Sequence, residues 1–436
     1  MAIMDTNSGE QLVAQAQALL AHGRLPAKVF SDPALHQLEV ERIFGRAWIF
    51  LAHETEIPAP GDYVMRHIVD DEFIVVRDDE GGVRVLFNSC RHRGMRVAQA
   101  GCGHAKTFRC PYHGWVYRND GRLQGVPYEN RIYGPGEIKK EEMGLLAAPR
   151  SESWNGMIFA SLSSDGPTLT EFLGNMAFYL EFYTRKSEAG LQVVGEPQRW
   201  VVRANWKLGA SNFIGDGYHT STTHFSTVKV GVLPGSADFL IDGVQVDADS
   251  GGLGFRRMPP GTGSTRGYGP EVMARFEPAH RAILESGCFP SHGTVFPNLS
   301  FLAAAAIVDQ GGAPVPYFTL RIWQPVAHDT IEIWSWMLID KSAPEALKRA
   351  SYTSYVLSFG SSGLLEQDDT ENWTSITRSA RGRMAGTQEL SYVMGSTSLP
   401  LMTDWPGPGK AYSMDYTEAA ERSFYQLWLR YLQEAT

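Results

Sequence analysis

The sequence predicts an α+β protein made of a small antiparallel β domain and a larger domain in which helices accompany an antiparallel sheet. Three observations support this. The chain has 436 residues, enough for about two or three domains of ~150 residues each. Short β-type runs separated by Gly, Pro, Asn and Asp turns fill the stretch from Trp48 to about Ser164. After Pro167, longer strand-like runs alternate with helical ones.

The first 45 residues have the pattern of two helices. Leu12, Ala16 and Leu20 fall on one face of the first, and Pro33 stands near the first turn of the second. We expect this segment, residues 1–45, to pack on the larger domain. The β domain is expected over residues 46–165, with strands at 62–69, 72–78, 83–89, 106–110, 114–118 and 157–162.

The larger domain, residues 166–436, is expected to begin with a helix over 170–183 and a strand over 198–206. A helical segment from about Leu208 to Phe225 follows, and the Gly-, Pro- and Arg-rich stretch from Gly251 to Pro270 is typical of a long surface loop. Strands rich in aromatic and β-branched residues are expected at 299–308, 316–326 and 330–340. Three helical stretches close the chain, at 343–360, after Gln367, and at 414–433.

Composition and charge exclude several classes of protein. With 43% hydrophobic and 20% charged residues, the chain is neither disordered nor collagen-like. The net charge of −9 and the lack of a basic stripe are untypical of a nucleic-acid binder. No apolar run is long enough for a membrane span, and the N-terminus lacks the basic region of a secretory signal. Four cysteines form no disulfide framework, so we expect a reduced, cytoplasmic protein that uses cysteine as a ligand.

Two Cys/His pairs are the strongest signal in the sequence. Cys90 and His92 stand in SCRHRG, and Cys110 and His113 stand in CPYHGW, each pair in a turn after a strand-like run. Two cysteines and two histidines also satisfy a tetrahedral zinc site. However, a common zinc finger takes its cysteines from one loop and its histidines from the other, whereas here each loop offers one of each. This arrangement favours a Rieske [2Fe–2S] cluster, in which histidines replace cysteines on one iron.

A second constellation lies in the segment NWKLGASNFIGDGYHTSTTHF. Asp216 and His219 are one helical turn apart, and His219 and His224 are five residues apart. On a regular helix the two histidines would be ~140° out of register. We therefore expect the helix to break or bulge between them, and the poor helix formers of residues 220–223 are compatible with that.

Two histidines need a carboxylate to complete a facial triad for non-haem Fe(II). The candidates are Asp368 and Asp369, far downstream in GLLEQDDTENW. The alternative interpretation is that one of them caps the following helix, and both interpretations can hold if one caps and the other ligates.

The two motifs in this order resemble the Rieske ring-hydroxylating oxygenases, and more narrowly their large (α) subunits of the naphthalene, biphenyl and salicylate-hydroxylase type. The resemblance spans roughly residues 40–375 and implies a Rieske domain joined to a helix-grip-like catalytic domain with an antiparallel sheet. It also implies that His219, His224 and Asp369 hold a mononuclear Fe(II). Asp216 would bridge between His219 and the cluster ligand His113 of a neighbouring subunit, and Asn212 would be a polar neighbour of the iron.

The resemblance further implies a terminal oxygenase of a multicomponent system. Electrons from NAD(P)H would arrive through a separate reductase and ferredoxin, and O₂ would cis-dihydroxylate a polycyclic or biaryl ring. The glycine cluster nearest to a nucleotide-binding pattern, GTGSTRG from Gly261, has the wrong spacing and is expected to be a mobile loop, with a lid over the pocket as one role for it. The α subunits would form a trimer, with or without a small β subunit (α3β3).

The family resemblance assigns the residues of the substrate pocket less specifically than it assigns the metal ligands. The positions that match its cavity lining are Phe213, Phe359, Leu365, His292 and Asn298. Leu365 and Thr222 stand where some members carry Trp, so their smaller side chains predict a larger pocket.

Three alternative functions of the chain stay open. They are an aromatic-acid (salicylate-type) monohydroxylase, a Rieske electron-transfer protein without oxygenase activity, and a binding module held together by zinc.

Overall fold

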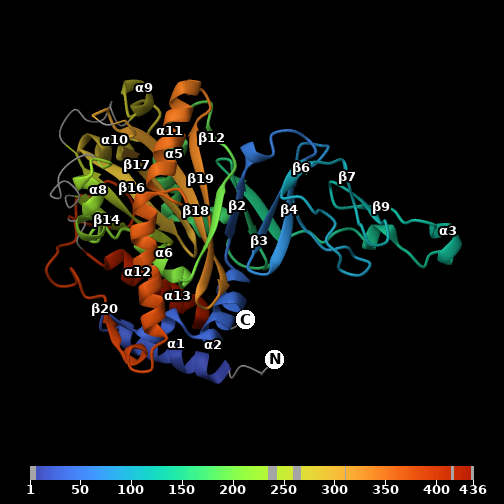
Figure 1. The fold of residues 1–436 in the computed structure, drawn as a ribbon, viewed down its shortest axis with the longest axis horizontal. Helices are drawn as coiled ribbons and strands as arrows, with labels where there is room; N and C mark the ends of the chain where they lie inside the picture. The colour runs from blue at the N-terminus through green and yellow to red at the C-terminus, as the bar shows by residue number, and fades with distance from the viewer. Residues whose placement is uncertain (1–5, 234–242, 259–266, 310, 414–416, 434–436) are drawn as a thin grey trace. The chain divides into compact units, whose positions relative to one another are not determined.

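The computed structural model describes residues 6–233, 243–258, 267–309, 311–413 and 417–433 (Figure 1). The chain divides into two compact units. The β unit comprises residues 44–169, and the larger unit comprises residues 1–43 and 170–436. Among the described residues, no helix has the length and apolar character needed to cross a bilayer.

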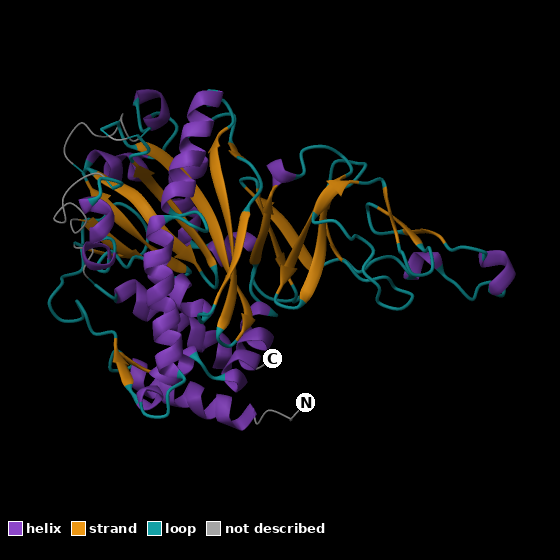
Figure 2. Ribbon diagram, viewed as in Figure 1, coloured by secondary structure: helices purple, strands orange, loops and turns teal. Residues whose placement is uncertain are grey.

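The β unit contains three antiparallel sheets (Figure 2). Their strand orders are β10-β11-β2, β5-β4-β3-β6 and β7-β8-β9. The strands are β2 (Ile49–His53), β3 (Asp62–Ile68), β4 (Asp71–Arg77), β5 (Val83–Phe87), β6 (Cys102–His104), β7 (Thr107–Arg109), β8 (Val116–Arg118), β9 (Leu123–Gly125), β10 (Arg150–Trp154) and β11 (Met157–Ser161). Short helical turns are η3 (Glu54–Glu56), α3 (Glu129–Ile132) and η4 (Lys140–Glu142).

The core of the β unit extends up to the two cysteines of the Cys/His pairs. Cys90 and Cys110 are buried in one cluster with Ile74, Trp115 and Tyr117. Strands β7 and β8, which precede and follow the Cys110 loop, pair in register and hold its two ends together. The loop that carries Cys110 and His113 is therefore built on a packed base.

The larger unit is organised around one nine-stranded antiparallel sheet of order β12-β19-β18-β17-β16-β15-β14-β21, with β13 also paired to β19. All of β14 and β16 is buried, as expected for strands covered on both faces. The strands are β12 (Leu191–Val193), β13 (Gln198–Val202), β14 (Gly243–Asp247), β15 (Gly251–Arg257), β16 (Cys288–Val295), β17 (Leu299–Ala306), β18 (Val315–Ala327), β19 (Thr330–Asp340) and β21 (Lys410–Tyr412). A separate pair joins β1 (Arg24–Pro26) to β20 (Glu389–Ser391).

Helices pack on this sheet. Helix α6 contacts β16, β17 and β18, α11 contacts β17, β18 and β19, and α13 contacts β14 and β15. The helices are α1 (Thr6–Leu20), η1 (Ala27–Phe30), α2 (Pro33–Glu39), η2 (Val40–Phe44), α4 (Leu169–Leu173), α5 (Asn175–Thr184), α6 (Trp206–Phe213), α7 (Thr220–Thr223), α8 (Phe225–Lys229), α9 (Pro270–Met273), α10 (Pro278–Glu285), α11 (Glu345–Ser358), α12 (Leu364–Ala380), η7 (Ala385–Thr387) and α13 (Ala419–Gln433).

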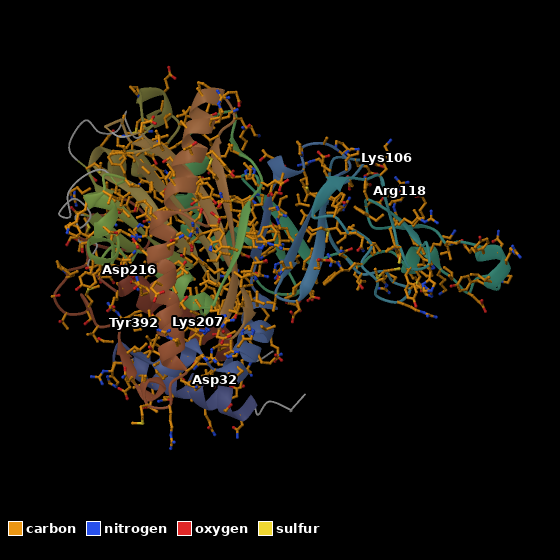
Figure 3. All side chains as sticks on the ribbon, viewed as in Figure 1. Asp32, Lys106, Arg118, Lys207, Asp216 and Tyr392 are labelled. Carbon is orange, nitrogen blue, oxygen red and sulfur yellow. The ribbon has the colours of Figure 1, made fainter. Side chains whose placement is uncertain are left out.

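A buried ion pair ties the N-terminal segment to this unit. Lys207 Nζ on α6 lies 2.6 Å from Glu39 Oε1 on α2, and both side chains are at most 1% exposed. Figure 3 labels Lys207 among the side chains of this unit. The same carboxylate accepts hydrogen bonds from the indoles of Trp206 and Trp428. Three separate stretches of sequence thus meet on one carboxylate.

The observed elements confirm the α+β fold class, with two corrections. The prediction of a loop from Gly251 to Pro270 is wrong for its first part, because residues 251–257 form strand β15, which is paired on both sides within the sheet. Its glycines have a packing reason, since a Cβ at Gly252 would lie 2.8 Å from Ala420 Cβ on α13. The predicted loop and lid over GTGSTRG lie largely outside the described residues.

The second correction concerns the helix expected from Leu208 to Phe225. It is interrupted, because α6 ends at Phe213 and only the short helices α7 and α8 follow. Gly215 adopts φ 146°, a backbone conformation that favours glycine. This interruption releases the chain from helical register before the first histidine.

Candidate metal centres

The two Cys/His loops of the β unit have the same backbone geometry. Cys90 N–H donates to Met95 O at 2.9 Å, and Cys110 N–H donates to Trp115 O at 2.8 Å. The N–H groups of Gly94 and Gly114 donate to the carbonyls of these same two cysteines.

The four side chains of the pairs converge between these loops. Cys90 and Cys110 are 3% and 2% exposed, and the rings of His92 and His113 lie 4.5 Å apart between centroids. His92 stacks on Trp115, whereas His113 is exposed. Two buried thiols beside two neighbouring imidazoles, one of them exposed, are the donor set of a cluster in which one iron takes sulfur and the other takes nitrogen.

Tyr117 supports the Cys90 sulfur. Its hydroxyl oxygen lies 3.1 Å from Cys90 Sγ and accepts a hydrogen bond from Arg91 N–H at 3.0 Å. When the sulfur is a thiolate ligand it carries no proton, so the phenol O–H is the donor in this contact. Burial raises the pKa of the Cys90 thiol and the hydrogen bond from Tyr117 opposes this rise, as expected for a group that stabilises a thiolate ligand.

Helix α6 leads the chain into the second centre. Asn205 caps its N-terminus through a hydrogen bond from Lys207 N–H to Asn205 Oδ1 at 3.2 Å. On the sheet side, Thr294 Oγ1 donates to Ala210 O at 2.8 Å. The helix is thus fixed on the sheet, and the loop from Ile214 to His219 starts from a defined position.

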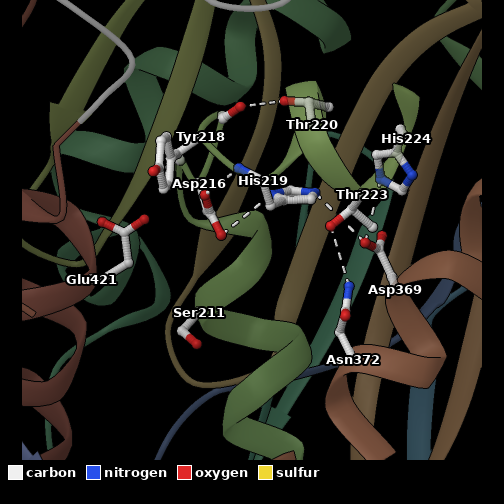
Figure 4. Close-up of polar contacts among 12 residues, drawn as sticks. Ser211, Asp216, Tyr218, His219, Thr220, Thr223, His224, Asp369, Asn372 and Glu421 are labelled. Carbon is white, nitrogen blue, oxygen red and sulfur yellow. Dashed lines mark hydrogen bonds and ion pairs between the residues drawn. The ribbon is translucent and has the colours of Figure 1, made fainter. Parts of the chain in front are cut away.

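Two histidines and one aspartate meet just beyond this loop (Figure 4). His219 Nε2 lies 3.6 Å from Asp369 Oδ1, and His224 Nε2 lies 3.3 Å from the same oxygen. One ligand atom from each residue lies within 4.8 Å of the others. His224 and Asp369 are buried, and neither Asp369 oxygen has a hydrogen-bond partner among the described residues. This donor set, with its unsatisfied buried carboxylate, fits a divalent metal of the two-histidine, one-carboxylate type.

The far side of each imidazole faces another carboxylate. His219 Nδ1 lies 3.2 Å from Asp216 Oδ2, and His224 Nδ1 lies 3.4 Å from Asp368 Oδ2. A carboxylate at Nδ1 leaves Nε2 to the metal and holds the ring in orientation. The geometry therefore distinguishes the adjacent aspartates, since Asp369 faces both Nε2 atoms and Asp368 faces one Nδ1.

Charge explains the pKa shifts of this site. Burial lowers the pKa of His219, but the carboxylate of Asp216 and then that of Asp369 outweigh it and raise the pKa to about 9. Burial raises the pKa of Asp216, yet the charge of His219 holds it below its ordinary value. The site is thus an anionic environment that attracts a cation.

Two local expectations are corrected here. Residues 220–223 form the single helical turn α7, and His219 before it has helical dihedrals, so the chain leaves helical geometry only at His224, with φ −97° and ψ 9°. Asp368 and Asp369 both lie inside α12, whose N-cap is Gly363, so neither caps that helix. One turn of helix between His219 and His224 replaces the break that we expected between them.

A cavity of about 140 Å³ adjoins His219, His224 and Asp369. Apolar side chains form much of its wall, as expected for a ligand site. Of the predicted site residues, Asn212, Phe213, Asp216, His292, Phe359 and Leu365 line it together with the two histidines and Asp369.

Asn298 and Thr222 are not among the described residues that line this cavity. Asn298 follows β16 in a turn, and its amide donates to Trp323 O at 3.3 Å. Thr222 is exposed on α7. The structure therefore does not bring these two residues to the cavity with the others.

Sequence reasoning missed two polar residues of the cavity and one contact beside it. Arg256 and Ser291 line the cavity, and Asp368 contacts His224. Arg256 lies on β15, a strand that we predicted to be a loop because it is rich in glycine. We considered Asp368 only as an alternative metal ligand to Asp369. Two adjacent acids can, however, have different roles at one site, since Asp369 faces the Nε2 atoms of both histidines and Asp368 faces the Nδ1 atom of one.

Comparisons with known proteins agree with this division. The family model described as a Rieske [2Fe-2S] domain matches residues 47–140, and the model described as the catalytic domain of the ring-hydroxylating α subunit matches residues 179–434. The chain is similar to a solved naphthalene 1,2-dioxygenase from Rhodococcus sp. bound to indole, with 43% identity, a TM-score of 0.90 and coverage of 97% of each chain.

Two characterised relatives also match nearly the whole chain. The N,N-dimethyl phenylurea N-demethylase subunit alpha of a Sphingobium strain is 35% identical, over 95% of this chain and 92% of the relative. The biphenyl 2,3-dioxygenase subunit alpha of Rhodococcus jostii is 35% identical, over 94% and 88%. The similarity therefore includes both candidate centres.

Proposed function

The chain belongs to the family of Rieske ring-hydroxylating oxygenase α subunits, and from this premise we propose that it cis-dihydroxylates a polycyclic or biaryl aromatic compound. Its role as a terminal oxygenase is confirmed by these matches, as are its two cofactors, a Rieske [2Fe–2S] cluster and a mononuclear iron. The substrate belongs to the proposal. The biphenyl and naphthalene enzymes among its relatives support a compound of two aromatic rings.

We propose that His219, His224 and Asp369 hold the mononuclear iron. The observation that carries this assignment is the buried Asp369 carboxylate, which has no hydrogen-bond partner among the described residues yet lies 3.6 and 3.3 Å from two imidazole nitrogens. A buried carboxylate without hydrogen bonds costs several kcal/mol unless a cation compensates it. When bound, the iron supplies the redox chemistry by which O₂ is activated.

In the β unit, we propose that Cys90 and Cys110 hold one iron of the cluster and that His92 and His113 hold the other. The exposure of His113 supports this, because electrons must enter and leave the cluster through its solvent side. The separate electron donors are expected to be a ferredoxin and an NAD(P)H-dependent reductase. The described residues contain four free cysteines, in keeping with a reducing cytoplasm.

Asp216 is proposed to connect the two kinds of centre between subunits. One of its oxygens lies 3.2 Å from His219 Nδ1, and its side chain also lines a second cavity of about 510 Å³ with Tyr218, Glu418 and Glu421. Figure 4 shows the Asp216 carboxylate between His219 and Glu421. The imidazole of His113 from a neighbouring subunit would reach Asp216 from this second cavity. Such head-to-tail contacts close in a ring, which is our reason for expecting a trimer.

Side chains of the cavity would orient the substrate. Phe213 and Phe359 offer aromatic faces whose ring centroids lie 6.1 Å apart in an edge-to-face arrangement. Their position beside Asp369 would hold a flat ring next to the metal and exclude water from it. Asn212 would add one polar contact at this edge of the cavity.

The first test is iron and acid-labile sulfide analysis of anaerobically purified protein, with EPR before and after reduction. We expect about three irons and two sulfides per chain together with a reduced Rieske signal. Naphthalene and biphenyl should give cis-dihydrodiols when a reductase and a ferredoxin are supplied. A monohydroxylated product from an aromatic acid would instead support the salicylate-type alternative.

One variant tests the ligand assignment directly. His219→Ala should lose the mononuclear iron and all oxygenation while it retains the Rieske spectrum. Loss of the cluster spectrum in this variant, or retention of three irons, would refute the assignment. The matched control is His104→Ala, which changes an exposed histidine paired with Asp62 in the β unit and should leave both iron counts unchanged.

A further inference from the structure

The cavity beside Asp369 has a polar wall made by two successive residues of β16. Ser291 and His292 both line it, although neighbours on a strand normally point to opposite faces. A β-bulge explains this, because Gly254 of β15 pairs with His292 and Phe255 pairs with Pro290, which leaves Ser291 as the extra residue. Bulges of this kind re-aim side chains next to active sites.

Hydrogen bonds define which nitrogen of His292 carries the proton. Ser291 Oγ donates to Gly254 O at 3.2 Å and lies 2.6 Å from His292 Nδ1. A hydroxyl has one proton, so when Ser291 donates to Gly254 it can only accept from Nδ1–H. This assignment satisfies both contacts and leaves the lone pair of His292 on Nε2.

His292 Nε2 is a buried acceptor that lacks a partner among the described residues. The side chain is 8% exposed, and Nε2 has no hydrogen bond there. Because Nδ1–H donates to Ser291 Oγ, the buried Nε2 offers an acceptor rather than a donor to whatever occupies the cavity.

We propose that His292 Nε2 accepts a hydrogen bond from the substrate, so that the enzyme prefers aromatic compounds that carry an O–H or N–H donor at the edge of the ring over plain hydrocarbons. This inference rests on the proposed function, since it takes the cavity as the aromatic binding site. The ring would pack on Phe213, Phe359 and Leu365 while its donor faces His292. A hydrocarbon in the same place would displace water and leave Nε2 unpaired, which is unfavourable.

An anionic substrate fits the wall less well. Arg256 also lines the cavity and donates to Thr220 Oγ1 at 3.2 Å. However, the carboxylate of Asp216 shares the cavity and would repel an aromatic acid, and His292 Nε2 cannot donate to it. The observations thus favour a neutral donor over a carboxylate.

The test measures binding to the oxidised holoenzyme, without electron donors, by equilibrium dialysis read out by naphthalene-ring fluorescence. The probes are 2-naphthol, 2-fluoronaphthalene and 2-naphthoate, which share a ring system and differ in the donor or charge that they carry. We expect 2-naphthol to bind about tenfold or more tightly than 2-fluoronaphthalene, since one satisfied buried acceptor separates them. His292→Leu should reduce this difference to about twofold or less, and His292→Gln, which keeps an acceptor, should retain part of it.

Three results would overturn the inference. The first is equal binding of 2-naphthol and 2-fluoronaphthalene by the wild type, which needs no variant to fold. The second is an undiminished preference in His292→Leu. The third is tightest binding of 2-naphthoate with a loss in Arg256→Gln, which would show an anion site. If both neutral probes bind equally and are oxygenated, only this inference fails. If neither binds and no aromatic compound is oxygenated, the proposed function fails with it.

Discussion

Replacing Lys207 by Met should destabilise the larger unit substantially. Lys207 Nζ lies 2.6 Å from Glu39 Oε1, and the two side chains are 0% and 1% exposed. The carboxylate also accepts from Trp206 Nε1 at 2.9 Å and Trp428 Nε1 at 2.8 Å. The ammonium faces the rings of Phe30 and both tryptophans. Each partner is therefore out of water and depends on the other.

The size of the effect follows from what each substitution leaves behind. Removal of one partner of a buried pair costs about 3–5 kcal/mol. Lys207→Met leaves a carboxylate that still accepts two indole hydrogen bonds, so we place it near the lower limit, about 3 kcal/mol. Glu39→Gln leaves the ammonium buried without its paired charge and places an NH2 group opposite an indole N–H, which puts it near the upper limit, about 5 kcal/mol. The double variant removes both charges and should be less destabilised than Glu39→Gln alone, by about 2 kcal/mol or more.

Thermal unfolding of the iron-loaded protein, followed by tryptophan fluorescence, measures these differences. At about 2 °C per kcal/mol for a domain of this size, Tm should fall by roughly 6 °C for Lys207→Met and roughly 10 °C for Glu39→Gln. Arg24→Met is the matched control, because Arg24 and Glu389 also join separate segments but are 57% and 43% exposed. It should shift Tm by less than about 2 °C. A Tm shift of less than about 2 °C in the two single variants would refute the reasoning. So would a double variant whose Tm falls by the sum of the two single shifts.

Three further predictions concern the metal centres. Asp216→Asn should leave three irons and two sulfides per chain but slow turnover severely, because the carboxylate that contacts His219 is proposed to connect the centres; wild-type turnover would contradict this. Tyr117→Phe should lower the midpoint potential of the cluster, because it removes a hydrogen bond to Cys90 Sγ, and should not cause loss of sulfide. A redox titration measures this, and an unchanged potential would show that the hydrogen bond is absent from the cluster-loaded protein. Asp368→Asn should weaken the affinity for the mononuclear iron by roughly 10–100-fold, whereas Asp369→Asn should abolish its binding. Competition with a chelator measures both affinities, and equal losses in the two variants would argue against separate roles of the two aspartates.

The sequence predicted the elements whose side chains carry a regular pattern. The strand expected at 330–340 is β19, because its aromatic and β-branched residues suit only a packed sheet. The Cys/His pairs were also evident, since metal ligands at short spacing stand out from any background. Such signals are local, and a single segment is enough to display them.

The remaining features depend on contacts between distant segments. Strand β15 was taken for a loop, because the glycines that allow α13 to approach it are also typical of loops. As a result Arg256 was not expected in the cavity. The separate roles of Asp368 and Asp369 depend on which face of α12 points toward the histidines, and more than 140 residues of chain separate them. A sequence pattern does not contain that packing.

The Asp369 carboxylate argues that this part of the chain is built for metal binding rather than for stability. Stability alone would favour an apolar side chain at a position that is 1% exposed, because an ionised carboxylate there loses its water and gains no hydrogen bond from the described residues. Asp216 and Asp368 face the Nδ1 sides of the neighbouring imidazoles, which leaves both Nε2 atoms directed at Asp369. Without a metal, a proton on His219 partly compensates the carboxylate, because its pKa is raised to about 9. A metal that displaces this proton meets three donor atoms that face one another. The buried pair of Arg321 and Glu366, one turn before Asp369 on α12, fixes this helix at a separate point, so the cost at Asp369 can be tolerated until a metal offsets it.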